Sequence, residues 1–169
     1  MNLEKFNNLG KQQAREELIK CCTSLSWVEA VEKRRPFSNL RELKDFAQEV
    51  WFSLSKTDWL EAFEGHPMIG DVESLKAKFS NTKKMASSEQ GLVVEADEEV
   101  INELSILNKE YFEKYGFIFI VFATGKSAVE MLNILKSRIV NSKEDEIKNA
   151  SIEQNKITIL RLEKVLCTQ

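Results

Sequence analysis

The residues with the clearest chemical potential lie around the single histidine of the chain. His66 sits in the segment GHPMIGD, residues 65–71, which forms a compact break between two predicted helices. A residue that precedes a proline favours extended backbone, and an imidazole titrates close to neutral pH, so His66 could serve as a positioned general acid or base. The alternative is a loop histidine whose ring hydrogen-bonds a backbone carbonyl.

A second candidate is the polar run ASSEQ, residues 86–90. Ser87 and Gln90 stand in the S-x-x-E/Q relation of a capping box, which would simply start a helix. Glu89 could instead orient a nearby histidine or stabilise its charged form. The sequence leaves both interpretations open.

A third candidate is an arginine on an apolar helix face. The C-terminal helix carries a stripe at steps of three and four residues, formed by Ile147, Ala150, Gln154, Ile157 and Arg161. A guanidinium on such a face calls for an anionic partner, which could be a protein carboxylate or a ligand carboxylate held bidentately. The alternative is an arginine that snorkels at the edge of the stripe, because a competing apolar face runs through Leu162 and Val165.

Composition argues against several other kinds of site. One histidine and three cysteines, with no CxxC or HxxxH spacing, supply too few ligands for zinc, so we expect no metal. Six glycines without a GxGxxG or GxxxxGK pattern argue against a nucleotide site. The run TGKS, residues 124–127, resembles the end of a phosphate-binding loop, but a cap for the next helix explains it more simply.

Charge and hydropathy limit the partners and the location. Lys and Arg number 24 against 27 Asp and Glu, and the signs are interspersed, so we expect no nucleic acid and no membrane as partner. The longest apolar run, residues 117–123, is too short to cross a bilayer, which takes about 20 residues. The adjacent residues Cys21 and Cys22 suit reduced thiols, so we expect a cytoplasmic protein.

Helices must position these residues. A chain of 169 residues, 43% of them hydrophobic, can bury one core, and its apolar residues recur mostly at steps of three and four. We predict helices over residues 12–22, 27–32, 39–54, 56–63, 72–79, 97–115, 128–140 and 143–166. Ser38, Ser55 and Asp71 are the predicted N-caps, and Gly116 is predicted to end a helix. Residues 117–121 are either a short buried extended segment or a tight link between helices.

Several motifs together resemble one protein family. They are SWVEAV (26–31), RPF (35–37), HPMIG (66–70), SEQ (88–90), GFIFIVFATGKSA (116–128) and KITILRLEKVL (156–166). Their order and spacing resemble the family of 2-oxo-4-hydroxy-4-carboxy-5-ureidoimidazoline (OHCU) decarboxylases, carboxy-lyases that release carbon dioxide and form (S)-allantoin in urate degradation. The resemblance implies an all-α fold in which residues 1–169 form a single-domain helical bundle, a homodimer, and a small-molecule substrate handled without a cofactor.

The resemblance also implies the site. The catalytic residues would be His66 and Glu89, and the substrate-binding residues would be Pro67, Ser87, Ser88, Gln90, Phe117, Ile118, Phe119, Ile120, Val121 and Arg161. The family commonly has a serine where this chain has Ala86, so one substrate hydrogen bond would have to come from Ser87 or Ser88. The family also commonly has a basic residue where this chain has Met68.

The chemistry suits a chain without a cofactor. The substrate loses carbon dioxide from a carbon next to a ring C=N, and the ring itself can take up the electron pair. Arg161 and backbone amides would bind the charged groups, while His66 would deliver a proton. Two alternatives stay open: a decarboxylase of another ureido or imidazolone acid, and a helical interaction module in which His66 and Arg161 are structural.

Overall fold

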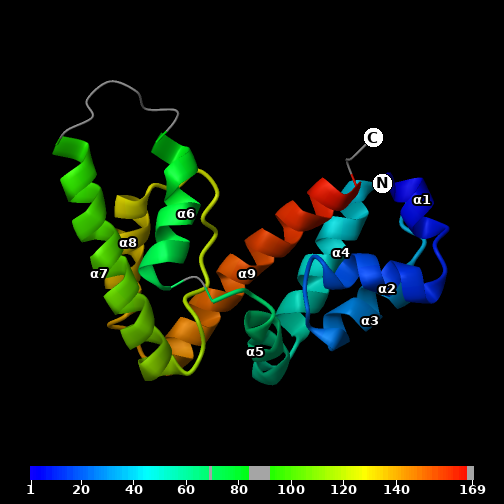
Figure 1. The fold of residues 1–169 in the computed structure, drawn as a ribbon. Coiled ribbons are helices and arrows are strands. Elements are labelled where there is room, and N and C mark those ends of the chain that lie inside the picture. The colour runs from blue at the N-terminus through cyan, green and yellow to red at the C-terminus, as the bar shows by residue number, and fades with distance from the viewer. Residues whose placement is uncertain (69, 84–91, 167–169) are drawn as a thin grey trace. The chain divides into compact units, whose positions relative to one another are not determined.

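The structure of the chain is a computed structural model that describes residues 1–68, 70–83 and 92–166. Over this part of the chain every regular element is an α-helix, which confirms the predicted all-α class (Figure 1). The helices are α1 (Leu3–Asn7), α2 (Lys11–Ile19), α3 (Leu25–Arg34), α4 (Leu40–Ser53), α5 (Lys56–Glu64), α6 (Val72–Lys83), α7 (Leu92–Tyr115), α8 (Ala128–Arg138) and α9 (Lys143–Leu166).

Side-chain caps set the starts of several helices. Ser55 and Asp58 form a capping box at α5, and Ser127 forms one with Glu130 at α8, so the TGKS run does cap the next helix. The predicted cap at Ser38 was wrong. Asn39 caps α4 instead, because its side chain accepts from the Glu42 backbone N–H at 2.9 Å, while the Ser38 backbone N–H donates to the Glu42 carboxylate.

The chain divides into two compact units. Unit 1 contains Met1–His66 and the chain from Ile147 onward, and unit 2 contains Pro67–Glu146. Helix α9 begins in unit 2 and continues in unit 1. The prediction that residues 1–169 form one domain stays a prediction.

Indole hydrogen bonds tie together the core of unit 1. Trp27 and Trp51 are almost fully buried, and helix α3 packs against α2 and α4. The Trp27 indole N–H donates to the Ala47 carbonyl, the Trp51 indole to the Ser151 carbonyl and the Trp59 indole to the Trp51 carbonyl, each at 2.9 Å. Trp27 and Trp51 therefore bury their rings without leaving the indole N–H unsatisfied, and the half-buried Trp59 also has a partner.

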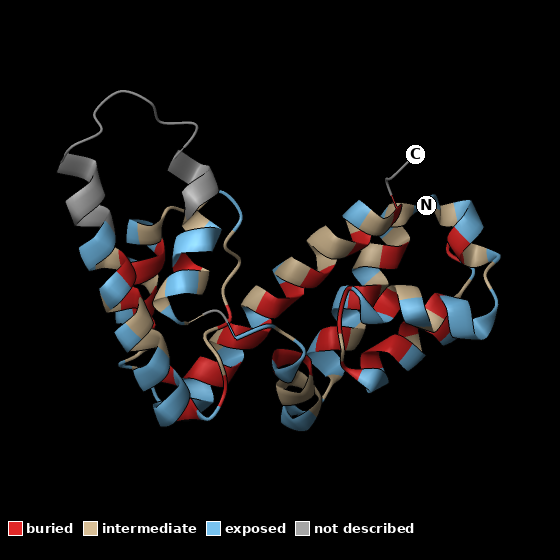
Figure 2. Ribbon diagram, in the orientation of Figure 1, coloured by how far each residue is buried: buried red, intermediate tan, exposed pale blue. Residues whose placement is uncertain are grey.

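Unit 2 is built on α7, which packs against α6 and α8 (Figure 1). Buried residues lie on the sides of these helices that face one another (Figure 2). Gly116, at φ +78°, ends α7 as predicted, since this left-handed backbone favours glycine. The following segment, 117–121, is neither helix nor strand, and it buries Phe117 and Ile120. It is thus a buried irregular connection between α7 and α8.

Candidate active site

The predicted site residues fall into three groups. His66 and Arg161 belong to unit 1, whereas Pro67 and the segment 117–121 belong to unit 2. Ser87, Ser88, Glu89 and Gln90, together with Ala86, lie outside the described residues. The structure therefore brings His66 and Arg161 into one unit, and the predicted roles of the other residues stay predictions.

The end of α5 fixes the backbone of His66. Gly65 is the C-cap of this helix, and the His66 N–H donates to the Phe63 carbonyl at 3.2 Å. A Cβ atom on residue 65 would collide with the side chain of Thr23, so the site has no room for a larger residue than glycine. The backbone that carries the His66 side chain is consequently held closely against the rest of unit 1.

A glutamine on α9 binds the ring of His66. The His66 Nε2 and Gln154 Oε1 atoms are 2.5 Å apart, and the Gln154 amide nitrogen donates to the Thr158 hydroxyl at 3.1 Å. Gln154 and Thr158 are only 1% and 2% exposed. Their spacing of four residues places them one helical turn apart on the buried face of α9. The helix thus presents a short polar chain to the imidazole.

The surroundings of His66 favour its neutral form. Burial lowers the pKa of the imidazole, the hydrogen bond with Gln154 opposes that shift, and the positive charge of Arg161 adds to it. The net direction is downward from an ordinary value of about 6.5. At neutral pH the ring is therefore an uncharged imidazole that can accept a proton.

Arg161 lies beside two buried thiols. Its Nη1 atom donates to the carbonyl of Cys21 at 3.3 Å. Burial raises the pKa of Cys21 to about 12 and that of Cys22 to about 11, although the charge of Arg161 pulls both values down. Both thiols are thus protonated at neutral pH. Among the described residues the side chain of Arg161 has no ion pair with a carboxylate.

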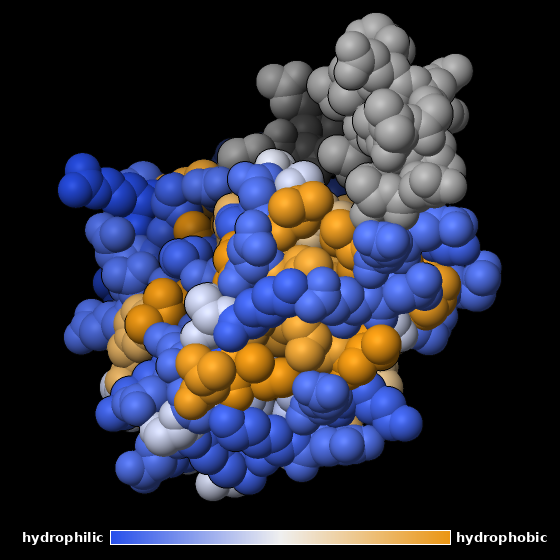
Figure 3. Space-filling view, turned by 90° about the vertical axis from the view of Figure 1, so that its left-hand side faces the viewer, coloured by the Kyte–Doolittle hydropathy of each residue, from blue (hydrophilic) through white to orange (hydrophobic). Residues whose placement is uncertain are grey.

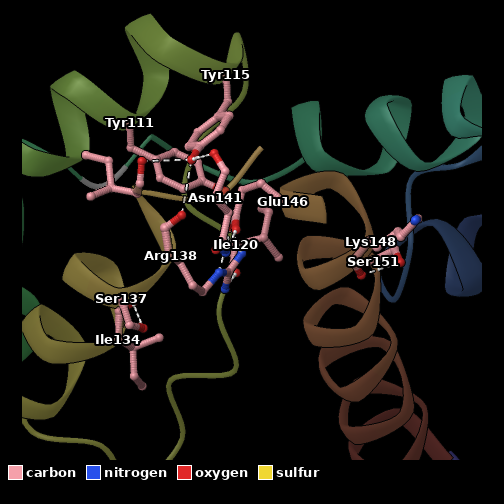
Figure 4. A network of polar contacts seen from close by, with 11 residues as sticks. Tyr111, Tyr115, Ile120, Ile134, Ser137, Arg138, Asn141, Glu146, Lys148 and Ser151 are labelled. Atoms are coloured by element: carbon pink, nitrogen blue, oxygen red, sulfur yellow. Dashed lines mark hydrogen bonds and ion pairs between the residues drawn. The ribbon is translucent and has the colours of Figure 1, made fainter. Parts of the chain in front are cut away.

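A buried ionic network in unit 2 holds the segment 117–121 (Figure 4). The Arg138 guanidinium donates to the Ile120 carbonyl at 2.6 Å and to the Glu146 carboxylate at 2.6 Å. It also lies over the ring of Phe119, 4.8 Å from its centroid. Arg138 therefore fixes this irregular segment by its contacts with the Ile120 carbonyl and the Phe119 ring.

Neutral donors complete the network around Glu146. The Tyr111 hydroxyl donates to one carboxylate oxygen at 2.5 Å, and the Asn141 amide donates to the other at 3.0 Å. Burial, followed by the hydrogen bond to Glu146, raises the pKa of Tyr111 well above its usual range, so the phenol keeps its proton and remains a donor. Sequence reasoning missed this network. Its signal is the presence of Arg138 and Glu146 at helix positions next to apolar core residues.

Two properties of the described residues bear on other classes of function. No group of three or more His, Cys, Asp or Glu side chains in that part of the chain is placed to hold a metal ion. None of the helices described there combines the length and the apolar character needed to cross a membrane.

Comparison with known proteins gives a consistent picture. A sequence model described as OHCU decarboxylase matches residues 7–163. The uric acid degradation bifunctional protein TTL of Arabidopsis thaliana is 34% identical over 146 residues, which cover 86% of this chain and 45% of that protein. The OHCU decarboxylase of Xenopus laevis is 22% identical over a stretch covering 96% of this chain and 93% of that protein. The chain spans less than half of the length of the bifunctional relatives that it matches.

Solved structures show the same similarity. A crystal structure of OHCU decarboxylase in the presence of (S)-allantoin has a TM-score of 0.72 and 33% identity, and covers 90% of this chain and 99% of its own. A crystal structure of (S)-allantoin synthase shares the fold, with a TM-score of 0.71 at 19% identity over 98% of this chain and 54% of its own.

Proposed function

The chain belongs to the OHCU decarboxylase family, and from this premise we propose that it converts OHCU to (S)-allantoin and carbon dioxide. The observation that carries the proposal is that the imidazole of His66, held by Gln154, and the guanidinium of Arg161 belong to the same unit, and that burial lowers the pKa of the ring. One group can exchange a proton and the other can bind a carboxylate. These are the two tasks that the reaction demands.

The proposed mechanism needs a single proton shuttle. When the carboxylate leaves as carbon dioxide, the bonding electron pair moves into the neighbouring ring C=N, and the nitrogen takes a proton from solvent. Neutral His66 accepts the proton of the hydroxyl on the carbon that carried the carboxylate. As an imidazolium it then delivers a proton to one face of the adjacent carbon, which yields a carbonyl and a single enantiomer.

We assign the other site residues from the motif match. Glu89 is the second catalytic residue and stabilises the imidazolium form of His66. The substrate-binding residues are Pro67, Ser87, Ser88, Gln90, Phe117, Ile118, Phe119, Ile120, Val121 and Arg161. For the segment 117–121, support comes from the bond between Arg138 and the Ile120 carbonyl, because a backbone that binds a ligand gains from being fixed in advance.

The deciding experiment follows freshly generated OHCU by circular dichroism. We expect the protein to accelerate the reaction beyond spontaneous decay and to produce only (S)-allantoin. A racemic product formed at the spontaneous rate would overturn the proposal and favour the interaction module. Faster turnover of a related ureido or imidazolone acid would move the assignment to that substrate. The His66→Asn variant is the matched negative control.

The remaining expectations concern assembly and location. We propose one domain over residues 1–169, because the family match crosses both units. We propose a homodimer because apolar side chains gather on one face (Figure 3), and unit 2 exposes Ile106 and Phe112 at 59% and 41%. Light scattering in solution tests the dimer.

A reducing compartment and catalysis without a cofactor complete the proposal. The free thiols of Cys21 and Cys22 are buried, which suits the cytoplasm. Activity should survive exhaustive dialysis against a chelator. A loss of activity that added metal restores would contradict the cofactor-free mechanism.

A further inference from the structure

The hydrogen bonds behind His66 have a direction that can be worked out atom by atom. An amide oxygen can only accept and an amide nitrogen can only donate. Since the oxygen of Gln154 faces His66 Nε2, that ring nitrogen must carry a proton. Since the amide nitrogen of Gln154 faces the Thr158 hydroxyl, the hydroxyl oxygen must accept. The orientation of one amide therefore decides which ring nitrogen is protonated.

Thr158 supplies the acceptor that this orientation requires. The Gln154 amide nitrogen donates to the Thr158 hydroxyl oxygen, so both the oxygen and the nitrogen of the amide have a partner. A flipped amide would place its oxygen against the hydroxyl and its nitrogen against the ring. The polar chain thus runs from His66 through Gln154 to Thr158.

The other ring nitrogen is left without a partner in this chain of bonds. Within the described residues, His66 Nδ1 makes no hydrogen bond. The charged or titratable groups around the polar chain and the thiols beside it are Arg161 on α9, the thiols of Cys21 and Cys22, which are protonated at neutral pH, and Glu17, Lys20 and Glu61. None of them takes the Nδ1 lone pair. This nitrogen is free to accept a proton.

We propose that Gln154, oriented by Thr158, is the positioning residue that keeps the proton of neutral His66 on Nε2 and leaves Nδ1 to exchange a proton with the substrate. The catalytic half of this statement rests on the proposed function. The tautomer itself does not, and it can be measured without substrate. Gln154 acts through His66 and touches no reacting atom.

The direct test is nitrogen NMR of the full-length protein labelled with ¹⁵N. Because the sequence contains one histidine, every imidazole signal comes from His66. We expect a protonated Nε2 whose proton exchanges slowly with water, and an Nδ1 with the shift of a lone-pair nitrogen. A neutral ring protonated at Nδ1 would overturn the proposal, whatever the activity of the protein.

Two substitutions of Gln154 should move the His66 pKa in opposite directions. Gln154→Leu removes the acceptor, so the pKa should fall further and the slowly exchanging Nε2 proton should be lost. Gln154→Glu supplies an acceptor with a negative charge, so the pKa should rise. Gln13→Leu, at an exposed position of α2, is the matched control and should change neither signal. A folded Gln154→Leu protein with unchanged signals would contradict the inference.

Thr158 gives a second test that avoids the glutamine. Thr158→Val removes the hydroxyl but keeps the branched shape, so the amide loses its anchor and the Nε2 proton should exchange faster. Thr158→Ser keeps the hydroxyl and should preserve slow exchange. Equal exchange in both folded variants would remove Thr158 from the proposal.

Kinetics link the tautomer to the reaction. Gln154→Leu should lower kcat more than it changes KM, because substrate contacts persist while the proton acceptor is no longer aligned. The acidic limb of the pH profile should move to lower pH in Gln154→Leu and to higher pH in Gln154→Glu. A Gln154→Leu variant with a raised KM and an unchanged kcat would make Gln154 a binding residue and overturn the positioning role. If wild-type protein forms no allantoin, the proposed function fails while the NMR result still decides the tautomer.

Discussion

The buried polar groups that hold His66 and those that hold Ile120 differ in kind. The ring of His66 is hydrogen-bonded by the neutral side chain of Gln154, which in turn donates to Thr158. Around Ile120, unit 2 buries full charges on Arg138 and Glu146, which are 8% and 0% exposed. The difference teaches that charge is placed where the backbone must stay fixed, and neutral dipoles where a proton must move.

Physical costs explain this division. A buried ion pair is costly unless hydrogen bonds satisfy its polar atoms, and Glu146 receives them from Tyr111, Arg138 and Asn141. Arg138 Nη2 has the ion pair with Glu146 and no hydrogen bond among the described residues. Such a network resists any change of protonation. A charged partner in place of Gln154 would similarly pin the state of His66. The neutral amide instead orients the ring and leaves it able to gain and lose a proton near neutral pH.

The largest expected effect is catalytic and belongs to unit 1. His66→Ala should reduce turnover of OHCU by about 10²- to 10⁴-fold, the usual contribution of a general acid–base group. The far-ultraviolet circular dichroism should be unchanged, since His66 follows α5 and belongs to no helix. Near wild-type turnover in this variant would show that His66, and with it the hydrogen bonds of Gln154 and Thr158, takes no part in catalysis.

The next effect is structural and belongs to unit 2. Glu146→Gln leaves the Arg138 charge buried without its counter-ion, so the free energy of unfolding should fall by about 3–5 kcal/mol in a urea titration. Glu103→Gln is the matched control, because its pair with Lys136 is about half exposed and should cost at most about 1 kcal/mol. Equal losses in the two variants would show that the network is no stronger than a surface pair.

A smaller change should separate the donors of that network. Tyr111→Phe removes the hydroxyl that donates to Glu146 and should cost about 1–3 kcal/mol, the range for leaving a buried polar atom short of a partner. The Tyr115 hydroxyl lies 2.9–3.1 Å from the carbonyls of Arg138, Ile139 and Asn141 at the end of α8. Tyr115→Phe should cost less in the same titration, since it deprives no charged group of a donor. The reverse ranking would contradict the central role of Glu146.

The smallest effect is the pH dependence that His66 gives to folding. Its pKa is lower in the folded chain than the ordinary value of about 6.5, so the unfolded chain binds the proton more readily. The stability linked to His66 is therefore fully present above about pH 6.5 and is lost as the pH falls through the folded pKa. Urea titrations of wild type and His66→Gln at about pH 8 and about pH 5 measure it. We expect the stability of wild type relative to the variant to decrease at the lower pH, and a constant difference would contradict the shift.

Local signals in the sequence predicted the helices well. Ser55, Gly116 and Ser127 act as expected because a cap depends on a few neighbouring residues. The misplaced cap at Ser38 arose because Ser38 and Asn39 are adjacent and both can cap, and only the backbone geometry distinguishes them. Helix α7 also begins at Leu92, earlier than the predicted residue 97.

Long-range partners could not be predicted in the same way. The sequence placed Gln154 on the stripe of Arg161, but its bond to His66 joins residues 88 positions apart. Arg138 and Glu146 look like ordinary helix-end charges until the fold buries them together. Hydrophobic periodicity identifies a buried face, but it does not identify which polar groups meet there.

The placement of the aromatic residues gives this protein two built-in optical reporters. All three tryptophans, Trp27, Trp51 and Trp59, lie in unit 1, and both tyrosines, Tyr111 and Tyr115, lie in unit 2. Indole emission during denaturation therefore follows unit 1, while the phenol bands, resolved from the stronger indole absorbance in second-derivative spectra, follow unit 2. Coincident transitions would mark one cooperative domain, and separate transitions would mark two. One denaturation of a single unlabelled sample can thus report the unfolding of each unit separately.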